Sequence, residues 1–390
     1  MNKITFCIPS KDNLRYLKMA IASILTNSEL DNEILVWLDS DNDNTSSWLD
    51  SMNIQYLVNS SPEPRGIAVG YNECIKVATT DIVCMFHADM YMAKGFDVNL
   101  VKYLKPKVVV AATRIEPPLH PTGKEKIIGD YGMYPEDFKK QQFDDFVEQT
   151  KLEYLNTTTS GIFAPWCCYK SDIMDINLHD ETFHSYHEDS DIFNRMILNN
   201  IKCIQSWDSL VYHFTCRGGQ FQDGIAQVTT NPKFHLMKSN AQRNYIRKWG
   251  SWIKNDEFQH PIIIPKYNIA IEVTSCNSQL LELLEPWCDR IYIDDEMGVL
   301  FAHYYETEQP NTLYDLKTRV MTSSYNDILG ENDIVVKINK TSFTQQDYNL
   351  IQNLSAIIQD SGELGTFKLG NLEITINHLE TYEKNLIKLS

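Results

Sequence analysis

Residues 82–89 read Ile-Val-Cys-Met-Phe-His-Ala-Asp, an apolar run that ends in a histidine, an alanine and an aspartate. The run has the length and composition of a buried strand, which in a parallel sheet is apolar on both faces. Open α/β sheets bind their ligands outside the carboxyl ends of their strands, which is where Asp89 falls. The stretch therefore predicts an α/β fold, and it predicts that Asp89 lies in the ligand site of its sheet.

Strands and helices alternate through the region before this stretch. The expected strands cover 4–8, 33–38, 54–58 and 82–86, and the expected helices cover 14–25 and 68–78. This alternation with short connections predicts an α/β fold, in which a mostly parallel sheet has helices on both faces. Pro9, Asp39 and Asp89 would then lie along the carboxyl edge of the sheet.

The chain returns to the same pattern after a long polar excursion. The expected elements are a strand at 107–113, a polar segment over 116–150 with a helix near 135–155, a strand at 160–169, a helix at 190–199, a strand at 211–214 and a loop from Arg217. This continuation favours one large N-terminal domain over residues 1–258.

A second domain is expected after two prolines, Pro261 and Pro265, that bracket a short apolar strip. We take 259–266 as a linker and 267–390 as a smaller α+β domain. Two β-α-β patterns in tandem within it suggest a ferredoxin-like module. Its role is open, with acceptor binding or a homo-oligomer contact as the possibilities.

Composition excludes several classes of protein. The 390 residues are 43% hydrophobic and carry a net charge of −17, which disfavours nucleic-acid binding because that affinity depends on cations. No apolar run is long enough to span a bilayer, and the first residues do not resemble a signal peptide. Nine scattered cysteines without a C-x-x-C pair indicate a reducing compartment. We therefore expect a cytoplasmic protein.

Two acidic positions carry the strongest chemical hypotheses. Asp89 is placed to hold a hard divalent cation beside a diphosphate, although an aspartate that ends a strand is also an ordinary turn residue. Asp189 is a candidate general base whose pKa a neighbouring Glu188 would raise. Alternatively, Asp189 or Ser190 caps the helix that follows.

The remaining candidates are each ambiguous by themselves. His213 would bring an imidazole to the metal or be a core histidine bonded to backbone. Asp39 would accept from a ribose hydroxyl or a base N–H, or close an Asx turn. The histidine spacing around His184 and His187 fits no standard zinc motif. Phosphate-cradling glycine loops are absent from the sequence.

The order of these pieces along the chain resembles the family 2 glycosyltransferases of the GT-A fold, over about residues 1–255. The matching pieces, in chain order, are 4–10, Asp39 with 43–45, Arg65-Gly66 with Tyr71-Asn72, 86–89, 187–191 and 211–214. The resemblance implies a donor site built from Pro9, Ser10, Asp39, Arg65, His87 and Asp89, in which Asp39 contacts the nucleobase.

The resemblance also implies roles in catalysis. The D-x-D motif of the family falls on His87-Ala88-Asp89, so that Asp89 coordinates Mn²⁺ or Mg²⁺ while histidine replaces the first aspartate. His213 matches a further metal ligand found in some members. Asp189, in the motif Glu188-Asp189, is the expected base. The Q-x-x-R-W motif of processive synthases is absent, which favours transfer of single sugars.

Together these expectations describe an inverting glycosyltransferase with Mn²⁺ or Mg²⁺, acting in polysaccharide biosynthesis. Its donor would be a nucleotide sugar, with UDP favoured, and its acceptor a glycan or glycoconjugate. Two alternatives stay open. One is a nucleotidyltransferase that makes nucleotide sugars, and the other is a non-catalytic carbohydrate-binding protein on a degenerate GT-A fold.

Overall fold

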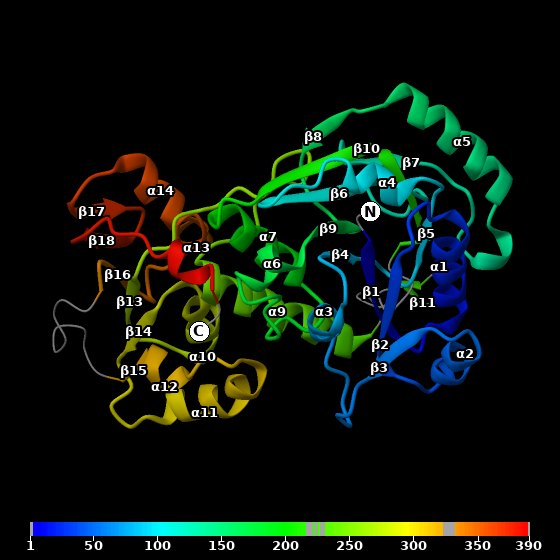
Figure 1. Ribbon diagram of the computed structural model, residues 1–390. Helices are drawn as coiled ribbons and strands as arrows, with labels where there is room; N and C mark the ends of the chain where they lie inside the picture. The colour runs from blue at the N-terminus through cyan, green and yellow to red at the C-terminus, as the bar shows by residue number, and fades with distance from the viewer. Residues whose placement is uncertain (1–2, 216–220, 223–224, 227–230, 323–331, 389–390) are drawn as a thin grey trace. The chain divides into compact units, whose positions relative to one another are not determined.

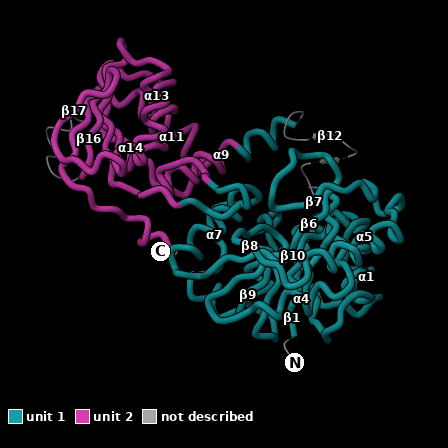
Figure 2. Tube along the Cα trace, turned by 90° about the horizontal axis from the view of Figure 1, so that it is seen from above, with its two compact units in different colours: residues 1–238, 255–262, 388–390 teal, residues 239–254, 263–387 magenta. Residues whose placement is uncertain are grey.

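The computed structural model describes residues 3–215, 221–222, 225–226, 231–322 and 332–388. The chain forms two compact units (Figure 2). The first unit comprises 1–238, 255–262 and 388–390, and the second comprises 239–254 and 263–387. The loop expected from Arg217 lies outside the described residues at 217–220.

The first unit contains a large mixed sheet with the strand order β3-β2-β1-β4-β9-β6-β10-β5 (Figure 1). Its first half is parallel and consists of β1 (Ile4–Lys11), β2 (Glu33–Ser40), β3 (Gln55–Val58) and β4 (Ile82–Met85). All four were expected from their apolar runs. The mostly parallel α/β fold is confirmed.

The second half of the sheet is built around two long strands. These strands, β6 (Val108–Glu116) and β10 (Lys202–His213), are parallel to each other. The shorter strands are β5 (Met90–Met92), β7 (Lys126–Ile128), β8 (Thr158–Ser160) and β9 (Trp166–Tyr169). Because β9 runs antiparallel to both β4 and β6, those two strands point the same way.

Helices of the first unit connect these strands. They are α1 (Leu14–Asn27), α2 (Thr45–Ser51), α3 (Ile67–Val77), α4 (Phe96–Val101), η1 (Pro135–Asp137), α5 (Lys140–Glu153), α6 (Lys170–Met174) and α7 (Glu188–Leu198). The connections β1→β2 and β3→β4 cross the sheet in opposite directions. Right-handed crossovers therefore place α1 and α3 on opposite faces. A short hairpin follows, with β11 (Phe221–Gln222) paired to β12 (Ile225–Ala226).

This strand order brings distant residues to one edge. The carboxyl ends of β1, β2, β4, β6 and β10 all point the same way. Asp39 lies in the end of β2, Asp89 follows β4, Glu116 ends β6 and His213 ends β10. The fold therefore supplies one edge on which side chains more than a hundred residues apart can meet.

The second unit has its own six-stranded sheet, in the order β15-β14-β13-β16-β18-β17. Four strands are parallel, namely β13 (Ile269–Thr274), β14 (Arg290–Ile293), β15 (Val320–Met321) and β16 (Ile334–Asn339). An antiparallel hairpin of β17 (Gly365–Leu369) and β18 (Leu372–Ile376) extends it. The suggested ferredoxin-like module is therefore wrong, because that module would not have four parallel neighbours.

Helices of the second unit pack an apolar core against this sheet. They are the C-terminal part of α9 (Pro232–Trp249), then α10 (Ser278–Leu284), α11 (Val299–Glu308), α12 (Leu316–Arg319), α13 (Gln345–Gln352) and α14 (Leu354–Ser361). The described residues of this unit also form the short 3₁₀ turns η2 (Glu285–Trp287), η3 (Gln309–Asn311) and η5 (Glu383–Leu386).

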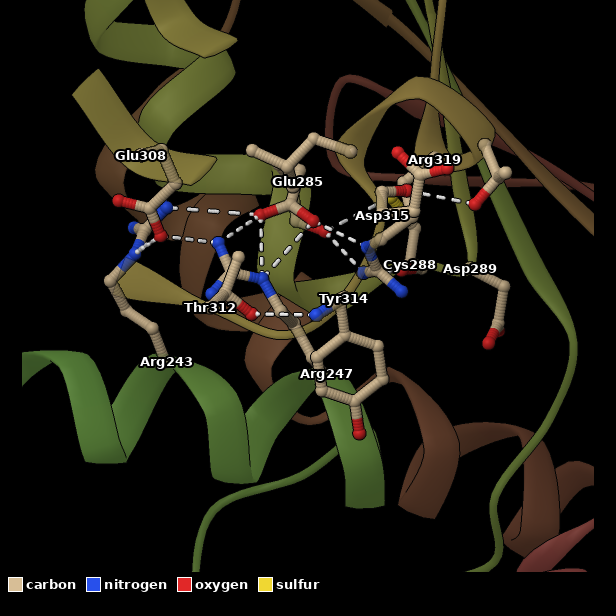
Figure 3. Close-up of polar contacts among 12 residues, drawn as sticks. Arg243, Arg247, Glu285, Cys288, Asp289, Glu308, Thr312, Tyr314, Asp315 and Arg319 are labelled. Atoms are coloured by element: carbon tan, nitrogen blue, oxygen red, sulfur yellow. Dashed lines mark hydrogen bonds and ion pairs between the residues drawn. The ribbon is translucent and has the colours of Figure 1, made fainter. Parts of the chain in front are cut away.

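A buried ion cluster explains why residues 239–254 group with the second unit. Arg243 and Arg247 of α9 and Arg319 of α12 surround the carboxylate of Glu285 (Figure 3). Arg247 Nη2 lies 2.6 Å from Glu285 Oε2, and Arg319 Nε lies 2.5 Å from Glu285 Oε1. Burial would raise the pKa of Glu285, but Arg319 and Arg247 outweigh it and lower that pKa to about 2. A buried anion with several cations holds the end of α9 firmly within this unit. The linker predicted at 259–266 stays a prediction.

No helix in the described parts of the chain combines the length and the apolar character needed to cross a membrane.

Candidate active site

Three side chains at the carboxyl edge of the first sheet form a group that could hold a metal ion. His87, Asp89 and His213 each offer one ligand atom, and these atoms lie within 4.8 Å of one another. The two imidazole rings have centroids 5.4 Å apart, and His213 Nε2 lies 3.5 Å from Asp89 Oδ1. Asp89 and His213 are 5% exposed, and His87 is partly exposed. The group thus brings together the two predicted metal ligands, Asp89 and His213, and it adds His87, which occupies the first position of the motif that ends at Asp89.

Strand pairing explains why these residues meet. The chain turns after β4 and returns as β5, which pairs antiparallel with β10 so that Met90 faces His213. The carbonyl of Asp89 accepts a hydrogen bond from the backbone N–H of Phe214 at 3.0 Å. The backbone itself therefore holds Asp89 beside His213.

The chemistry of this donor set fits a divalent cation. A carboxylate and two imidazoles suit Mn²⁺, which accepts both oxygen and nitrogen ligands. Burial, together with the charge of His213, lowers the pKa of His87 to about 4, so its ring is neutral. Burial would lower the pKa of His213 too, but the carboxylates of Asp89 and Glu116 outweigh it and raise that pKa to about 9.

Glu116 is a functional candidate that the sequence did not reveal. Its carboxylate is 2% exposed and accepts a hydrogen bond from His213 Nδ1 at 2.8 Å. Arg114 and Lys126 bond the same carboxylate at 2.9 Å and 3.0 Å. The expected strand stopped at Thr113, which left Glu116 in the polar excursion. The only signal was the alternation of Arg114 and Glu116, which places both side chains on one face of a strand.

The carboxyl pair Glu188-Asp189 opens helix α7. Burial raises the pKa of both groups, most for Glu188, and the charge of Arg114 partly offsets the rise for Asp189. His187, with a φ of 69°, occupies the N-cap position, so α7 already includes both Asp189 and Ser190. The alternative that Asp189 or Ser190 caps the helix is therefore wrong. A desolvated carboxylate of raised pKa is suited to general base chemistry.

Tyr71 shares the environment of this carboxyl pair. Burial, then Asp189 and Glu188, raise the pKa of its phenol well above the usual value. Its hydroxyl and Glu188 Oε2 are buried polar atoms without a hydrogen-bond partner among the described residues. Buried polar atoms left unpaired are uncommon, and they are found where a ligand or water is to be bound. Both atoms can therefore still form a hydrogen bond with a ligand or a water molecule.

Asp191, the next acidic residue, has a structural role. It bonds Arg195 Nε at 2.8 Å with both side chains fully buried. Arg195 also donates to the carbonyls of Ile176 and Leu178, each at 2.6 Å. This pair anchors the segment before α7 to the helix, and it leaves Asp189 and Glu188 as the candidates for the base.

Asp39 anchors the loop between β3 and α3. Its carboxylate accepts from the backbone N–H of Arg65 at 2.7 Å and of Gly66 at 2.9 Å, and from Asn59 Nδ2 at 3.1 Å. Arg65 and Asn59 engage both lone pairs of Oδ1, but Oδ2 has a further lone pair, so a base N–H can still be accommodated there. The expected nucleobase contact stays a prediction, and loop anchoring is an additional role.

Other predicted donor-site residues lie around this loop. Ser10 is 5% exposed, and its hydroxyl has no hydrogen-bond partner in the described chain. Pro9 and Trp37 approach Gly70 of α3 so closely that a Cβ there would lie 2.9 Å and 2.7 Å from their side chains. Arg65 bonds Glu181 Oε2 at 3.1 Å. That ion pair connects the loop before α3 with the segment that precedes Glu188.

Backbone contacts join the same two segments. The carbonyl of His184 accepts from the N–H of Ile67 at 2.8 Å, and His184 Nδ1 lies 3.1 Å from the carbonyl of Arg65. Asn72 bonds Glu181 Oε1 at 3.1 Å from the first turns of α3. The donor-side loop and the segment before the carboxyl pair are therefore one connected structure.

Comparisons with known proteins bear on this edge of the sheet. Residues 5–161 match the family model described as glycosyl transferase family 2. A search among curated proteins found no match.

Solved structures similar to this chain include S. aureus TarS 1–349, with 12% identity, a TM-score of 0.40, and coverage of 55% of this chain and 60% of that one. GalNAc-T7, solved with UDP, GalNAc and Mn²⁺, has 11% identity, a TM-score of 0.43, and coverage of 63% and 48%. A mannosyltransferase from Pyrobaculum calidifontis, solved with GDP-Man and Mn²⁺, has 16% identity, a TM-score of 0.39, and coverage of 55% and 58%. The similarity spans less than two thirds of each of these proteins.

Proposed function

We propose, on the premise that residues 5–161 are a glycosyl transferase family 2 domain, that this enzyme is metal-dependent and inverting. It moves one sugar from a nucleotide sugar, with UDP-sugars favoured, to a hydroxyl of a glycan or glycoconjugate. The observation that supports this function best is the group of His87, Asp89 and His213 on the sheet edge that also holds Asp39.

His87, Asp89 and His213 would hold the divalent cation. When bound, such a cation supplies charge stabilisation for the diphosphate that leaves as the glycosidic bond breaks. The pairing of β5 with β10 fixes Asp89 and His213 before any ligand arrives, so the site needs little rearrangement.

Asp189 would act as the base in a single displacement. The acceptor oxygen forms its bond to the anomeric carbon while the bond from that carbon to the phosphate oxygen breaks. The acceptor proton passes to the carboxylate of Asp189, and the nucleoside diphosphate departs with the bonding electrons. One displacement from the opposite face inverts the anomeric configuration. The raised pKa of Asp189 makes it a stronger base than an exposed aspartate.

Two observations favour this function over the alternatives. The loop after β1 begins at Asp12, whose carboxylate accepts hydrogen bonds from the backbone and side chain of Asn42. A nucleotidyltransferase would need a basic, glycine-rich loop at this place. A carbohydrate-binding protein would not need two adjacent carboxyls of raised pKa, Glu188 and Asp189, in addition to a three-ligand metal group. We therefore favour a glycosyltransferase over a nucleotidyltransferase and over a carbohydrate-binding protein.

Slow donor hydrolysis tests the proposal without knowledge of the acceptor. The full chain is incubated with UDP-, GDP- or dTDP-sugars, with and without Mn²⁺, and the released nucleotide is measured. We expect release from one donor class, dependence on the cation, and loss of release in Asp89→Asn. Asp175→Asn, which removes an exposed carboxylate of the same unit, serves as the control. Release that is independent of the cation, or no release from any donor, would contradict the function.

A further inference from the structure

Glu116 lies behind the metal group rather than in it. It ends β6, where the register pairs Ile115 with Tyr212 of β10, so Glu116 comes next to His213. The β7 strand pairs Lys126 with Arg114, which brings a second cation to the same place. Three donors from three neighbouring strands thus converge on one buried carboxylate.

Every contact of this carboxylate is a charge-assisted hydrogen bond. Oε1 accepts from His213 Nδ1 at 2.8 Å and from Arg114 Nη1 at 2.9 Å. Oε2 accepts from Lys126 Nζ at 3.0 Å. Both oxygens of this buried carboxylate are therefore engaged by donors of the protein, and Glu116 is not a member of the metal-holding group found among the described residues.

The hydrogen bond fixes the orientation of the His213 ring. An imidazole that donates from Nδ1 can offer a lone pair only from Nε2. That Nε2 is the nitrogen that faces Asp89 Oδ1, at 3.5 Å. A carboxylate that accepts from the far nitrogen of a ligating histidine also makes its imidazole a stronger ligand.

We propose that Glu116 is a positioning residue, which holds His213 with Nε2 directed at the divalent cation and strengthens its binding. This inference rests on the proposed metal dependence. Glu116 acts through His213 and touches neither the donor nor the reacting atoms. Arg114 and Lys126 bond the same carboxylate and hold it in place beside His213.

Cation binding by the full chain tests the inference directly. Mn²⁺ titration followed by electron paramagnetic resonance compares the parent with Glu116→Gln. The glutamine keeps an acceptor for Nδ1–H but removes the charge, and we expect Mn²⁺ affinity to fall by about 10- to 100-fold. Glu125→Gln is the matched control, because Glu125 is buried and contacts Arg114 at 3.4 Å but does not touch His213. We expect this control to bind Mn²⁺ as the parent does.

A spectroscopic readout on the parent protein makes the test independent of how the variant folds. In ¹⁵N-histidine-labelled protein saturated with diamagnetic Mg²⁺, we expect His213 to carry its proton on Nδ1. A proton on Nε2 would overturn the inference, as would equal Mn²⁺ affinity in the parent and a folded Glu116→Gln. If the parent binds neither cation, the proposed metal dependence fails and this inference falls with it. If the parent binds Mn²⁺ and only the Glu116 comparison fails, the proposed function stands.

Discussion

The carbonyl oxygen of His184 lies 2.0 Å from the position that a Cβ on Gly66 would occupy. Gly66 has φ 86° and ψ 177°, a conformation that is almost confined to glycine. The two segments therefore pack backbone against backbone, and the hydrogen bond from Ile67 to His184 depends on that approach. A single glycine thus joins the donor-side loop to the segment that precedes Glu188 and Asp189.

Gly66→Ala should separate these segments. The methyl group cannot fit against a backbone carbonyl, and the strained φ alone costs about 1–3 kcal/mol. We expect a lower melting temperature for the first unit and weaker UDP binding, measured by thermal denaturation and calorimetry. Gly95→Ala is the control, because Gly95 also has a positive φ but meets only the flexible ends of side chains. Equal effects of the two substitutions would show that the contact with His184 is unimportant.

Asp39→Ala distinguishes loop anchoring from nucleobase recognition. The substitution leaves the N–H groups of Arg65 and Gly66 without their acceptor, at a cost of about 1–3 kcal/mol for each buried group that stays unpaired. If Asp39 only anchors the loop, calorimetry should show UDP and GDP affinities falling by the same factor. If it also reads the base, as expected from the sequence, UDP affinity should fall further than GDP affinity. Unchanged affinity for both nucleotides would exclude either role.

The carboxyl pair Glu188-Asp189 should make stability depend on pH. Burial raises the pKa of Glu188 in the folded protein, so the folded state binds this proton more tightly than the unfolded state does. The resulting stability is fully present below the ordinary glutamate pKa, about 4.3, and is lost as pH rises through the raised folded value. Denaturant unfolding of the ligand-free protein should therefore show stability that declines from mildly acid pH upward.

Glu188→Gln should remove part of that decline, because glutamine does not ionise. The comparison is made between pH 5 and pH 8.5, with Glu181→Gln as a control for a more exposed carboxylate nearby. Parallel pH profiles for the parent and Glu188→Gln would show that Glu188 is not the group responsible. The remaining decline is assigned to Asp189 and His213, whose pKa values are also raised in the folded protein.

The first half of the large sheet was predictable because its signals are local. The apolar runs of β1, β2 and β4 and the helical spacing of α1 and α3 are each visible within about a dozen residues. Asp39 and Asp89 follow from the same signals, since each falls where a recognised strand ends. Both residues lie at the expected edge.

Glu116 shows what local patterns cannot supply. Within its strand, Arg114 and Glu116 alternate with apolar residues like the solvent-facing side of a sheet. Only the pairing of β6 with β7 and β10 reveals that this face is buried. Similarly, β15 of the second unit has two residues, Val320–Met321, too few for any periodicity. The parallel order of that sheet could not be inferred without it.

Asp189→Asn should remove the proposed base with little effect on stability. Asp189 lies in the first turn of α7 rather than at its N-cap, and its carboxylate is partly exposed. Asparagine has nearly the same shape, and the loss of a negative charge near a helix N-terminus costs about 0.3–1 kcal/mol. Removal of an anion held in a desolvating environment offsets that loss. We therefore expect the variant to melt close to the parent temperature.

Transfer should respond very differently. A positioned general base contributes about 10²- to 10⁴-fold to a rate, so Asp189→Asn should lose most of its transfer while its affinity for UDP and Mn²⁺ is kept. In the parent, transfer should rise with pH through the raised pKa of this carboxyl, since only the ionised form accepts a proton. Asp175→Asn should transfer as the parent does. If Asp189→Asn keeps near-parent transfer, Asp189 is not the base, and Glu188 becomes the candidate because Asp191 is committed to Arg195.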